Sequence, residues 1–207
     1  MNKIDIVHHN ILYPAGFFAL FMKWKYKTPY LVTENWTGYL PTDKSYKGFI
    51  RKTVTKMIAN GAAILTPVSE DLAKALKSHG FKTNYEIVPN VVDTNLFRPS
   101  ISKPGRDKKQ ILHISTLNER QKNFSGLLRA IKGVSSIRKD FELLVITNGD
   151  ATECVQYAEE LNILNNIVHF EYEKSGEEIA ENLRNTDFLV LFSNYENLPC
   201  VLLEALA

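Results

Sequence analysis

The sequence predicts an α/β protein with two parallel sheets, and three observations lead to this class. Short runs rich in Val, Ile and Leu alternate with longer amphipathic stretches, as in β-α units whose strands are buried on both faces. The length of 207 residues exceeds a typical domain of about 150 residues. Residues 97–109 lack periodicity and contain Pro99, Pro104 and Gly105, which is typical of a linker. We therefore expect two Rossmann-like halves.

In the first half, four short apolar runs predict strands, and the amphipathic stretches between them predict helices. The strands are expected at 4–8, 30–33, 63–66 and 85–88, and the helices at 16–26, 47–60 and 69–79. Ser69, followed by two acidic residues, indicates the start of the third helix, and Gly80 indicates its end. The half opens directly on its first strand, without a glycine-rich turn before it.

The second half repeats this alternation. Strands are expected at 111–115, 142–147, 167–171 and 188–192, and helices at 125–137, 152–161, 177–185 and 199–207, the last with Pro199 at its first position. The predicted organisation is a partial N-terminal domain over 1–98, a linker over 99–109 and a partial C-terminal domain over 110–207.

Composition excludes several classes of protein. With 44% hydrophobic and 11% aromatic residues, the chain has enough apolar surface to form a core and is not a disordered polymer. Cys154 and Cys200 have no paired-ligand spacing, which argues against a disulfide scaffold and a zinc site. No apolar stretch approaches the roughly 20 residues of a membrane span, and no secretion signal is recognisable. We expect a cytoplasmic protein.

The net charge of +2 is unevenly distributed. Residues 1–60 contain nine Lys and Arg against three acidic residues, which gives +6, and the remainder sums to −4. Such asymmetry favours an anionic partner for the first part, such as lipid headgroups or a phosphorylated acceptor, although solvated helix faces explain it equally well. Residues 13–26 combine aromatic side chains with lysines. They are either a face touching the inner membrane or, by their close spacing, mostly core packing with a basic end.

The common nucleotide and catalytic motifs are absent. None of the ten glycines forms G-x-G-x-x-G or a P-loop, which disfavours a nicotinamide enzyme and a P-loop ATPase. There is no H-E-x-x-H, no G-x-S-x-G and no acidic D-x-D cluster, so no metal site is predicted.

The C-terminal segment carries the sharpest signal. Glu196 is expected in the loop after the last strand, where open α/β sheets bind ligands, and Glu204 in the following helix. The N–H groups of Cys200 and Val201, at the helix start, are suited to a phosphate. Two carboxylates can each accept hydrogen bonds from a vicinal diol. Two glutamates at this spacing also occur by chance in many helices.

Four segments resemble one family, the group 1 (family 4) retaining glycosyltransferases of GT-B fold, over essentially the whole chain. Glu196 to Glu204 resembles its E-x7-E signature, and the Leu-Leu-Glu-Ala-Leu-Ala ending is typical of it. The remaining segments, in the order of the family, are Thr66–Ser69, Val88–Asp93 with Phe97, and Lys122–Asn123.

The resemblance implies roles for individual residues. Lys122 would face the pyrophosphate of a UDP- or GDP-linked sugar and stabilise its departure without a metal or other cofactor. Glu204 would accept hydrogen bonds from the ribose and Glu196 would contact the transferred sugar. The other residues implied at the donor are Asn197 and Leu198, whose amides follow Glu196, Cys200 and Val201 near the phosphates, and the backbone of Tyr172 and Glu173 near the base. On the acceptor side they are Asn35 and Ser69.

Three positions depart from the family pattern. Thr116 stands where an Arg is usual, which leaves Arg120 as its substitute. Asn35 replaces a histidine, and an amide cannot take up a proton at neutral pH. Pro199 replaces a Gly and removes one backbone donor. Simpler roles also exist: Lys122 as a solvated lysine, Ser69 as a helix cap, and Asn90 and Asp93 as turn residues.

The leading hypothesis is a glycosyltransferase of hexosyltransferase type in bacterial polysaccharide or lipopolysaccharide biosynthesis. Its partners would be a nucleotide sugar and a glycan or lipid-linked acceptor, with peripheral contact to the inner face of the membrane and no nucleic acid. The alternatives are a non-catalytic nucleotide-sugar-binding or assembly module, which Asn35 and Thr116 favour, and an epimerase of the same fold. Further β-α units are expected at both ends, so we expect a central fragment with weak or no activity alone.

Overall fold

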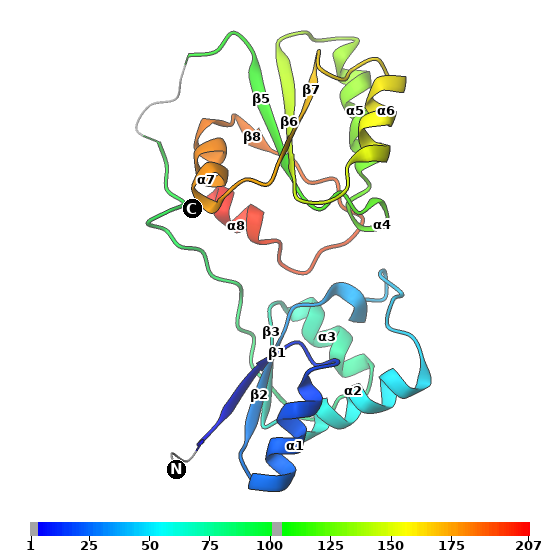
Figure 1. Cartoon of the computed structure of the whole chain (residues 1–207), viewed down its shortest axis with the longest axis vertical. Coiled ribbons are helices and arrows are strands. Elements are labelled where there is room, and N and C mark those ends of the chain that lie inside the picture. The colour runs from blue at the N-terminus through cyan, green and yellow to red at the C-terminus, as the bar shows by residue number, and fades with distance from the viewer. Residues whose placement is uncertain (1–3, 101–104) are drawn as a thin grey trace. The chain divides into compact units, whose positions relative to one another are not determined.

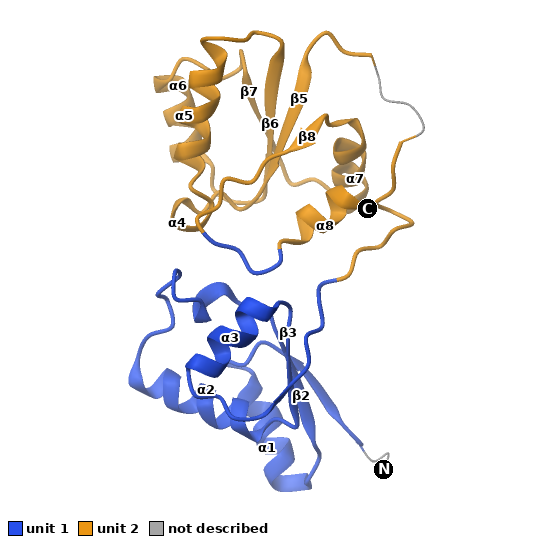
Figure 2. Ribbon diagram, turned by 180° about the vertical axis from the view of Figure 1, so that it is seen from behind, with its two compact units in different colours: residues 1–90, 195–198 blue, residues 91–194, 199–207 orange. Residues whose placement is uncertain are grey.

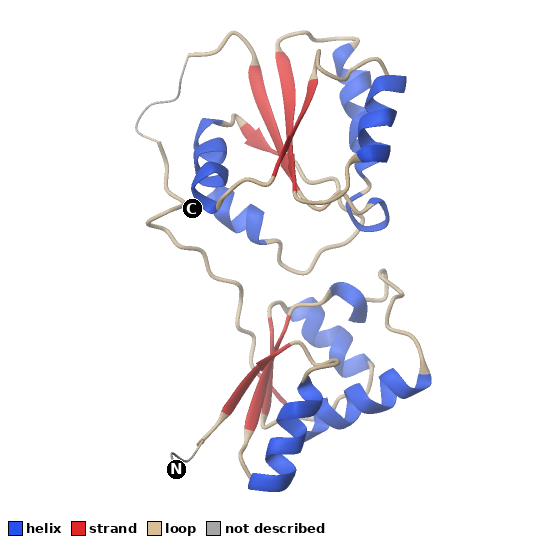
Figure 3. Ribbon diagram, in the orientation of Figure 1, coloured by secondary structure: helices blue, strands red, loops and turns tan. Residues whose placement is uncertain are grey.

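The computed structural model describes residues 4–100 and 105–207, and these form two compact units. Unit 1 comprises residues 1–90 and 195–198, and unit 2 comprises residues 91–194 and 199–207 (Figure 2). Unit 1 thus includes Tyr195–Leu198, a segment that chain order alone assigns to the second half. Each unit contains one four-stranded sheet with helices packed against it (Figure 3).

Unit 1 is built on a parallel sheet with the strand order β1-β2-β3-β4 (Figure 1). In β2 the alternate residues Tyr30, Val32 and Glu34 are fully buried. The strands are β1 (Val7–Asn10), β2 (Tyr30–Glu34), β3 (Ile64–Pro67) and β4 (Asn84–Tyr85), and the helices are α1 (Gly16–Tyr26), the 3-10 turn η1 (Thr37–Tyr39), α2 (Phe49–Gly61) and α3 (Glu70–Ser78).

Unit 2 repeats the parallel arrangement with the order β7-β6-β5-β8. The central strand β6 is buried along both faces, as a parallel sheet covered by helices requires. The strands are β5 (Lys109–Ile114), β6 (Phe141–Thr147), β7 (Val168–Tyr172) and β8 (Phe188–Leu189), and the helices are α4 (Glu119–Lys122), α5 (Phe124–Ser135), α6 (Thr152–Glu160), α7 (Gly176–Asn185) and α8 (Cys200–Leu206).

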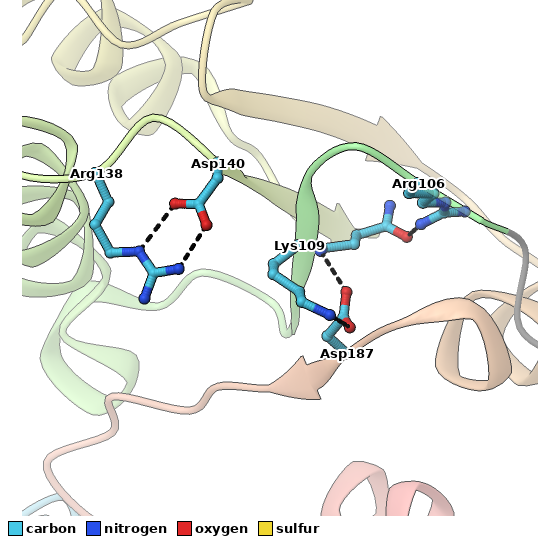
Figure 4. Close-up of polar contacts among 6 residues, drawn as sticks. Arg106, Lys109, Arg138, Asp140 and Asp187 are labelled. Atoms are coloured by element: carbon cyan, nitrogen blue, oxygen red, sulfur yellow. Dashed lines mark hydrogen bonds and ion pairs between the residues drawn. The ribbon is translucent and has the colours of Figure 1, made fainter.

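Polar contacts fix the amino ends of the unit 2 strands (Figure 4). The Asp187 carboxylate, just before β8, accepts hydrogen bonds from the Gln110 N–H at 2.8 Å and from the Lys109 Nζ at 3.0 Å. Arg138 and Asp140 form a two-bonded ion pair before β6, and Arg106 donates to the Gln110 side chain. These contacts lie at the edge opposite to the predicted site and leave the carboxyl ends of the strands open for function.

All eight predicted strands and all seven predicted helices are present, most of them with shifted bounds. The outer strands β4 and β8 have only two residues each, whereas the other two outer strands, β1 and β7, have four and five. Two short elements, η1 and α4, were not predicted, since three or four residues show no periodicity. Pro199 is not the first helical residue: its ψ of 122° is extended, so that it caps α8 and Cys200 begins the helix.

The interpretation of residues 13–26 as mostly core packing is wrong. Only Gly16 and Ala19 of α1 are buried, whereas Phe17, Phe18 and Trp24 are 59%, 63% and 79% exposed. The reason is steric: a Cβ on Gly16 would lie 2.8 Å from the Ile58 side chain, so α1 packs through its small residues. The large rings are left on the opposite, outer side.

The buried carboxylate of Glu34 holds the carboxyl edge of the unit 1 sheet together. Its Oε2 accepts a hydrogen bond from the Leu12 N–H at 2.8 Å, beyond the end of β1. Its Oε1 accepts from the N–H groups of Asn35 at 3.0 Å and Trp36 at 2.9 Å, beyond β2. Burial raises the pKa of Glu34, and these three donors counteract part of the rise. One side chain therefore satisfies three backbone donors in two neighbouring loops.

Replacement of Glu34 by Gln should destabilise unit 1. The amide retains one acceptor oxygen but presents an NH₂ group to at least one backbone donor, which is then buried without a partner. We expect the free energy of unfolding to fall by about 2 kcal/mol. Both tryptophans, Trp24 and Trp36, lie in unit 1, so denaturant unfolding followed by tryptophan fluorescence measures this unit. The matched control Glu86→Gln, at an exposed position, should change little. Equal stability of the two variants would contradict the assignment.

Candidate functional site

Most of the predicted site residues lie in the loops that follow the strands or in the helices α4 and α8. They are divided between the units, and each group is described within its own unit. Unit 1 holds Asn35, Ser69, Glu196, Asn197 and Leu198; unit 2 holds Thr116, Arg120, Lys122, Tyr172, Glu173, Cys200, Val201 and Glu204.

In unit 1, the segment Tyr195–Leu198 is held by two side-chain amides. The Asn197 Nδ2 donates to the carbonyl oxygen of Asn35 at 2.8 Å, and the Asn90 Nδ2 donates to that of Leu198, also at 2.8 Å. Because the Asn35 N–H is bonded to Glu34, the buried carboxylate also supports the position of Asn197. Glu196 directly precedes these two anchored residues and is half-buried.

Two of the simpler roles were predicted correctly, and one was not. Ser69 is the N-cap of α3, and its hydroxyl accepts from the Leu72 N–H at 3.2 Å. Asp93 holds a turn by accepting from the Asn95 N–H at 2.9 Å. Asn90, expected to hold a turn as well, instead reaches Leu198, more than a hundred positions away. Sequence spacing contains no signal for a contact of that range.

In unit 2, the predicted phosphate-binding cations lie on α4, the short helix that was missed. Asn118 caps it by accepting from the Gln121 N–H at 3.1 Å, and Asn123 ends it with a left-handed backbone at φ 49°. Lys122 is thus the last residue of α4, and the long helix expected at 125–137 begins at Phe124 as α5. The Lys122 side chain is half-buried and Arg120 is exposed.

The loop that leads to the glutamate pair begins against α4. Asn194 donates its backbone N–H to the Gln121 carbonyl at 2.8 Å and its side-chain Nδ2 to the Arg120 carbonyl at 3.1 Å. Since this loop joins β8 to α8, the contact ties the carboxyl edge of the sheet to the helix that carries Arg120 and Lys122. Asn194 is not among the predicted site residues, because its role depends on a contact over about seventy positions.

A cavity of about 200 Å³ opens at the carboxyl ends of β5 and β6. It is lined by Thr116 after β5, by Thr147 at the end of β6 and Asn148 after it, and by Lys174 after β7. Tyr172 and Glu173, predicted near a base, are exposed and precede Lys174 directly; the Glu173 N–H donates to the Thr147 carbonyl. Hydroxyl, amide and amine groups can recognise the polar edge of a small ring. Lys174 is an addition to the predicted set.

Glu204 lies on α8 and lines a second cavity of unit 2, of about 260 Å³, together with Arg184 and Phe97. Burial raises the pKa of Glu204. Cys200 and Val201 are the first two residues of α8, and their N–H groups have no acceptor one turn earlier within the helix. These are the groups that the sequence suggested for diol and phosphate binding.

Within residues 4–100 and 105–207, no three His, Cys, Asp or Glu side chains are grouped so that they could hold a metal ion. In the same part of the chain, no helix is long and apolar enough to cross a membrane.

Replacement of Gly149 by Ala should disturb the cavity at the carboxyl edge. A Cβ at this position would lie 2.5 Å from the Thr116 carbonyl oxygen, so the loop after β5 has to move. We expect a loss of about 1–3 kcal/mol in unit 2 stability, measured by calorimetry. Gly133→Ala is the matched control: nothing lies within 4 Å of its new Cβ, and the loss of a helical glycine should stabilise by about 0.5–1 kcal/mol. The two substitutions should therefore change the stability of unit 2 in opposite directions. Equal changes would contradict the close approach of Gly149 to the Thr116 carbonyl.

Comparison with known proteins gives matches along the whole chain. A family model described as glycosyl transferases group 1 matches residues 97–207, and one described as glycosyltransferase family 4 matches residues 1–96. A curated relative is the MMP alpha-(1->4)-mannosyltransferase of Mycolicibacterium hassiacum, 28% identical over 99% of this chain and 46% of its own length. The chain spans about half the length of the curated relatives it matches.

Solved structures with low identity share the fold. Sucrose-phosphate synthase from Thermosynechococcus elongatus superposes with a TM-score of 0.82 at 18% identity, over 97% of this chain and 53% of that one. HepE of Anabaena, solved in complex with UDP and glucose, gives a TM-score of 0.73 at 14% identity, over 93% of this chain and 54% of that one. The family model that covers residues 97–207 accounts for more than half of the chain. The protein therefore belongs to the group 1 glycosyltransferases, and its two four-stranded parallel sheets are those of the GT-B fold.

Proposed function

We propose that the protein transfers a hexosyl group from a UDP- or GDP-linked sugar to a glycan or lipid-linked acceptor, with retention of the anomeric configuration. The observation that carries this proposal is the constellation at the carboxyl edge of unit 2. There Asn194, in the loop that follows β8, donates hydrogen bonds to the carbonyl groups of Gln121 and Arg120 on α4, the helix that also bears Lys122. Family membership and the HepE complex with UDP and glucose support the choice of donor.

The proposed chemistry is electrostatic. As the bond between the sugar and the diphosphate breaks, negative charge grows on the departing phosphate oxygens. Lys122, assisted by Arg120, would stabilise that charge, so that the reaction needs no metal ion. The first N–H groups of α8 would bind the same phosphates. Thr116 is short and uncharged and cannot replace an arginine, so Lys122 would be the main positive charge at the phosphates.

The remaining residues would orient the donor and the acceptor. Glu204 would accept hydrogen bonds from the ribose hydroxyls and Glu196 from the hydroxyls of the transferred sugar. Asn197 and Leu198 would present backbone amides to the donor. The cavity lined by Thr116 and Lys174, next to Tyr172 and Glu173, would take the base. On the acceptor side, Asn35 can orient a hydroxyl but cannot deprotonate it.

A non-catalytic nucleotide-sugar-binding module is the second candidate, and Asn35 and Thr116 are the residues that favour it. The two functions differ in turnover. Incubation with a radiolabelled nucleotide sugar releases labelled sugar, or transfers it, only if the protein is an enzyme.

For the enzyme, we propose a role in bacterial polysaccharide or lipopolysaccharide biosynthesis and a location at the cytoplasmic face of the membrane, where lipid-linked acceptors are present.

Nucleotide binding is the first test. UDP or GDP at millimolar concentration should raise the thermal unfolding temperature, since a ligand that binds only the folded state stabilises it. Lys122→Met should weaken binding of the preferred nucleotide about tenfold or more, through loss of one charge-assisted phosphate contact. Lys108→Met, at an exposed position of the same unit, is the matched control and should bind normally. No thermal shift with either nucleotide, or equal binding by both variants, would reject the proposed donor site.

A further inference from the structure

An apolar groove runs between α1 and α2 on the surface of unit 1. It has a volume of about 530 Å³ and is lined by Phe17, Leu20, Phe21 and Trp24 of α1 and by Met57 of α2, with Lys23 and Lys27. We call this surface the α1–α2 face. Trp24 is 79% exposed, Met57 55% and Phe21 39%. Large apolar side chains gathered in this way mark an interaction site on a soluble protein.

Charge identifies the kind of partner that fits the α1–α2 face. From Ile6 to Ser69 the chain has eight Lys and Arg residues and only two acidic ones, Glu34 and Asp43. Both acidic side chains are buried, at 0% and 6% exposure. This entire stretch therefore presents cations and no exposed carboxylate to solvent, and nothing in it repels an anionic surface.

The lysines of α1 lie close to its aromatic rings. The Lys25 Nζ lies 5.2 Å from the centre of the Tyr26 ring and 5.7 Å from that of Phe21. The Lys23 Nζ donates to the Gly61 carbonyl, at the end of α2, over 2.7 Å. Aromatic rings next to lysines are the composition that binds the headgroup region of a bilayer: rings enter the boundary with the acyl chains and amines meet phosphates.

We propose that the α1–α2 face docks onto an anionic lipid bilayer. A second copy of the chain does not suit it, because two faces with the same positive charge repel each other. Docking requires no sugar transfer, so it can hold or fail independently of the proposed function. If both hold, docking brings the protein to the surface on which a lipid-linked acceptor lies.

Vesicle co-sedimentation tests the proposal directly. The protein should sediment with vesicles of phosphatidylglycerol and phosphatidylcholine, and at least about tenfold more weakly with phosphatidylcholine alone, since each lysine near the surface contributes to binding. The double variant Lys25→Glu, Lys27→Glu should lose about tenfold or more in affinity. Lys74→Glu, Lys82→Glu makes the same charge change at exposed lysines elsewhere in unit 1, and should keep most of the binding.

Trp24 gives a readout of the contact itself. Brominated phosphatidylglycerol should quench tryptophan fluorescence in the wild type, and Trp24→Phe should abolish most of the quenching because Trp36 is half-buried. The proposal is overturned if the protein does not sediment with anionic vesicles, if it binds neutral vesicles with equal affinity, or if the two double variants bind anionic vesicles with equal affinity. It is also overturned if quenching survives in Trp24→Phe, or if the face mediates dimerisation in sedimentation velocity instead. Circular dichroism of each variant confirms that it is folded.

Discussion

The parallel direction of the strands is the constraint on which the rest of the protein depends. All strands of a parallel sheet end at the same edge, so the loops that follow them meet there, whatever their distance in the chain. In unit 2 this places Thr116 after β5, Thr147 at the end of β6 and Lys174 after β7 around one cavity. The opposite edge carries ion pairs such as Arg138 with Asp140. The fold thus separates a stabilised edge from an edge available for ligands.

In unit 1 the same constraint leaves backbone N–H groups at the carboxyl edge without partners in the sheet, and Glu34 accepts hydrogen bonds from three of them. Loops that leave the carboxyl edge carry backbone N–H groups without ladder partners, and leaving them unpaired when buried is costly. A single carboxylate accepts three of them. Burial raises the pKa of this group, so the arrangement costs free energy in itself. The hydrogen bonds fix the position of Asn35, and the Asn35 carbonyl oxygen accepts a hydrogen bond from the Asn197 side-chain amide. Glu34, which has no proposed role in the reaction itself, thereby supports the loop that contains Glu196.

Much of the fold could be predicted from the sequence, because hydrophobic periodicity and helix caps are local signals. α1 begins and ends at the predicted residues, and Ser69 caps α3 as expected. Features that depend on distant contacts could not be predicted. Asn90 was expected to hold a turn and Asn194 was given no role, and only the tertiary structure shows their partners about seventy or more positions away. The exposure of the α1 aromatics was missed for a related reason: Gly16 and Ala19 make the packing contact, and small residues give little periodic signal.

The central claim is that the carboxyl edge of unit 2 binds a nucleoside diphosphate through residues contributed by separate strands and helices. The most direct measurement is an NMR titration of the isotope-labelled chain with UDP and with GDP, followed by backbone amide shifts. We expect one of them to shift the amides of Thr116, Lys122 and Glu173 together, with a single dissociation constant, while amides at the opposite edge, such as Asp140, stay unchanged. Shifts scattered over both edges, confined to unit 1, or absent with both nucleotides would contradict the account.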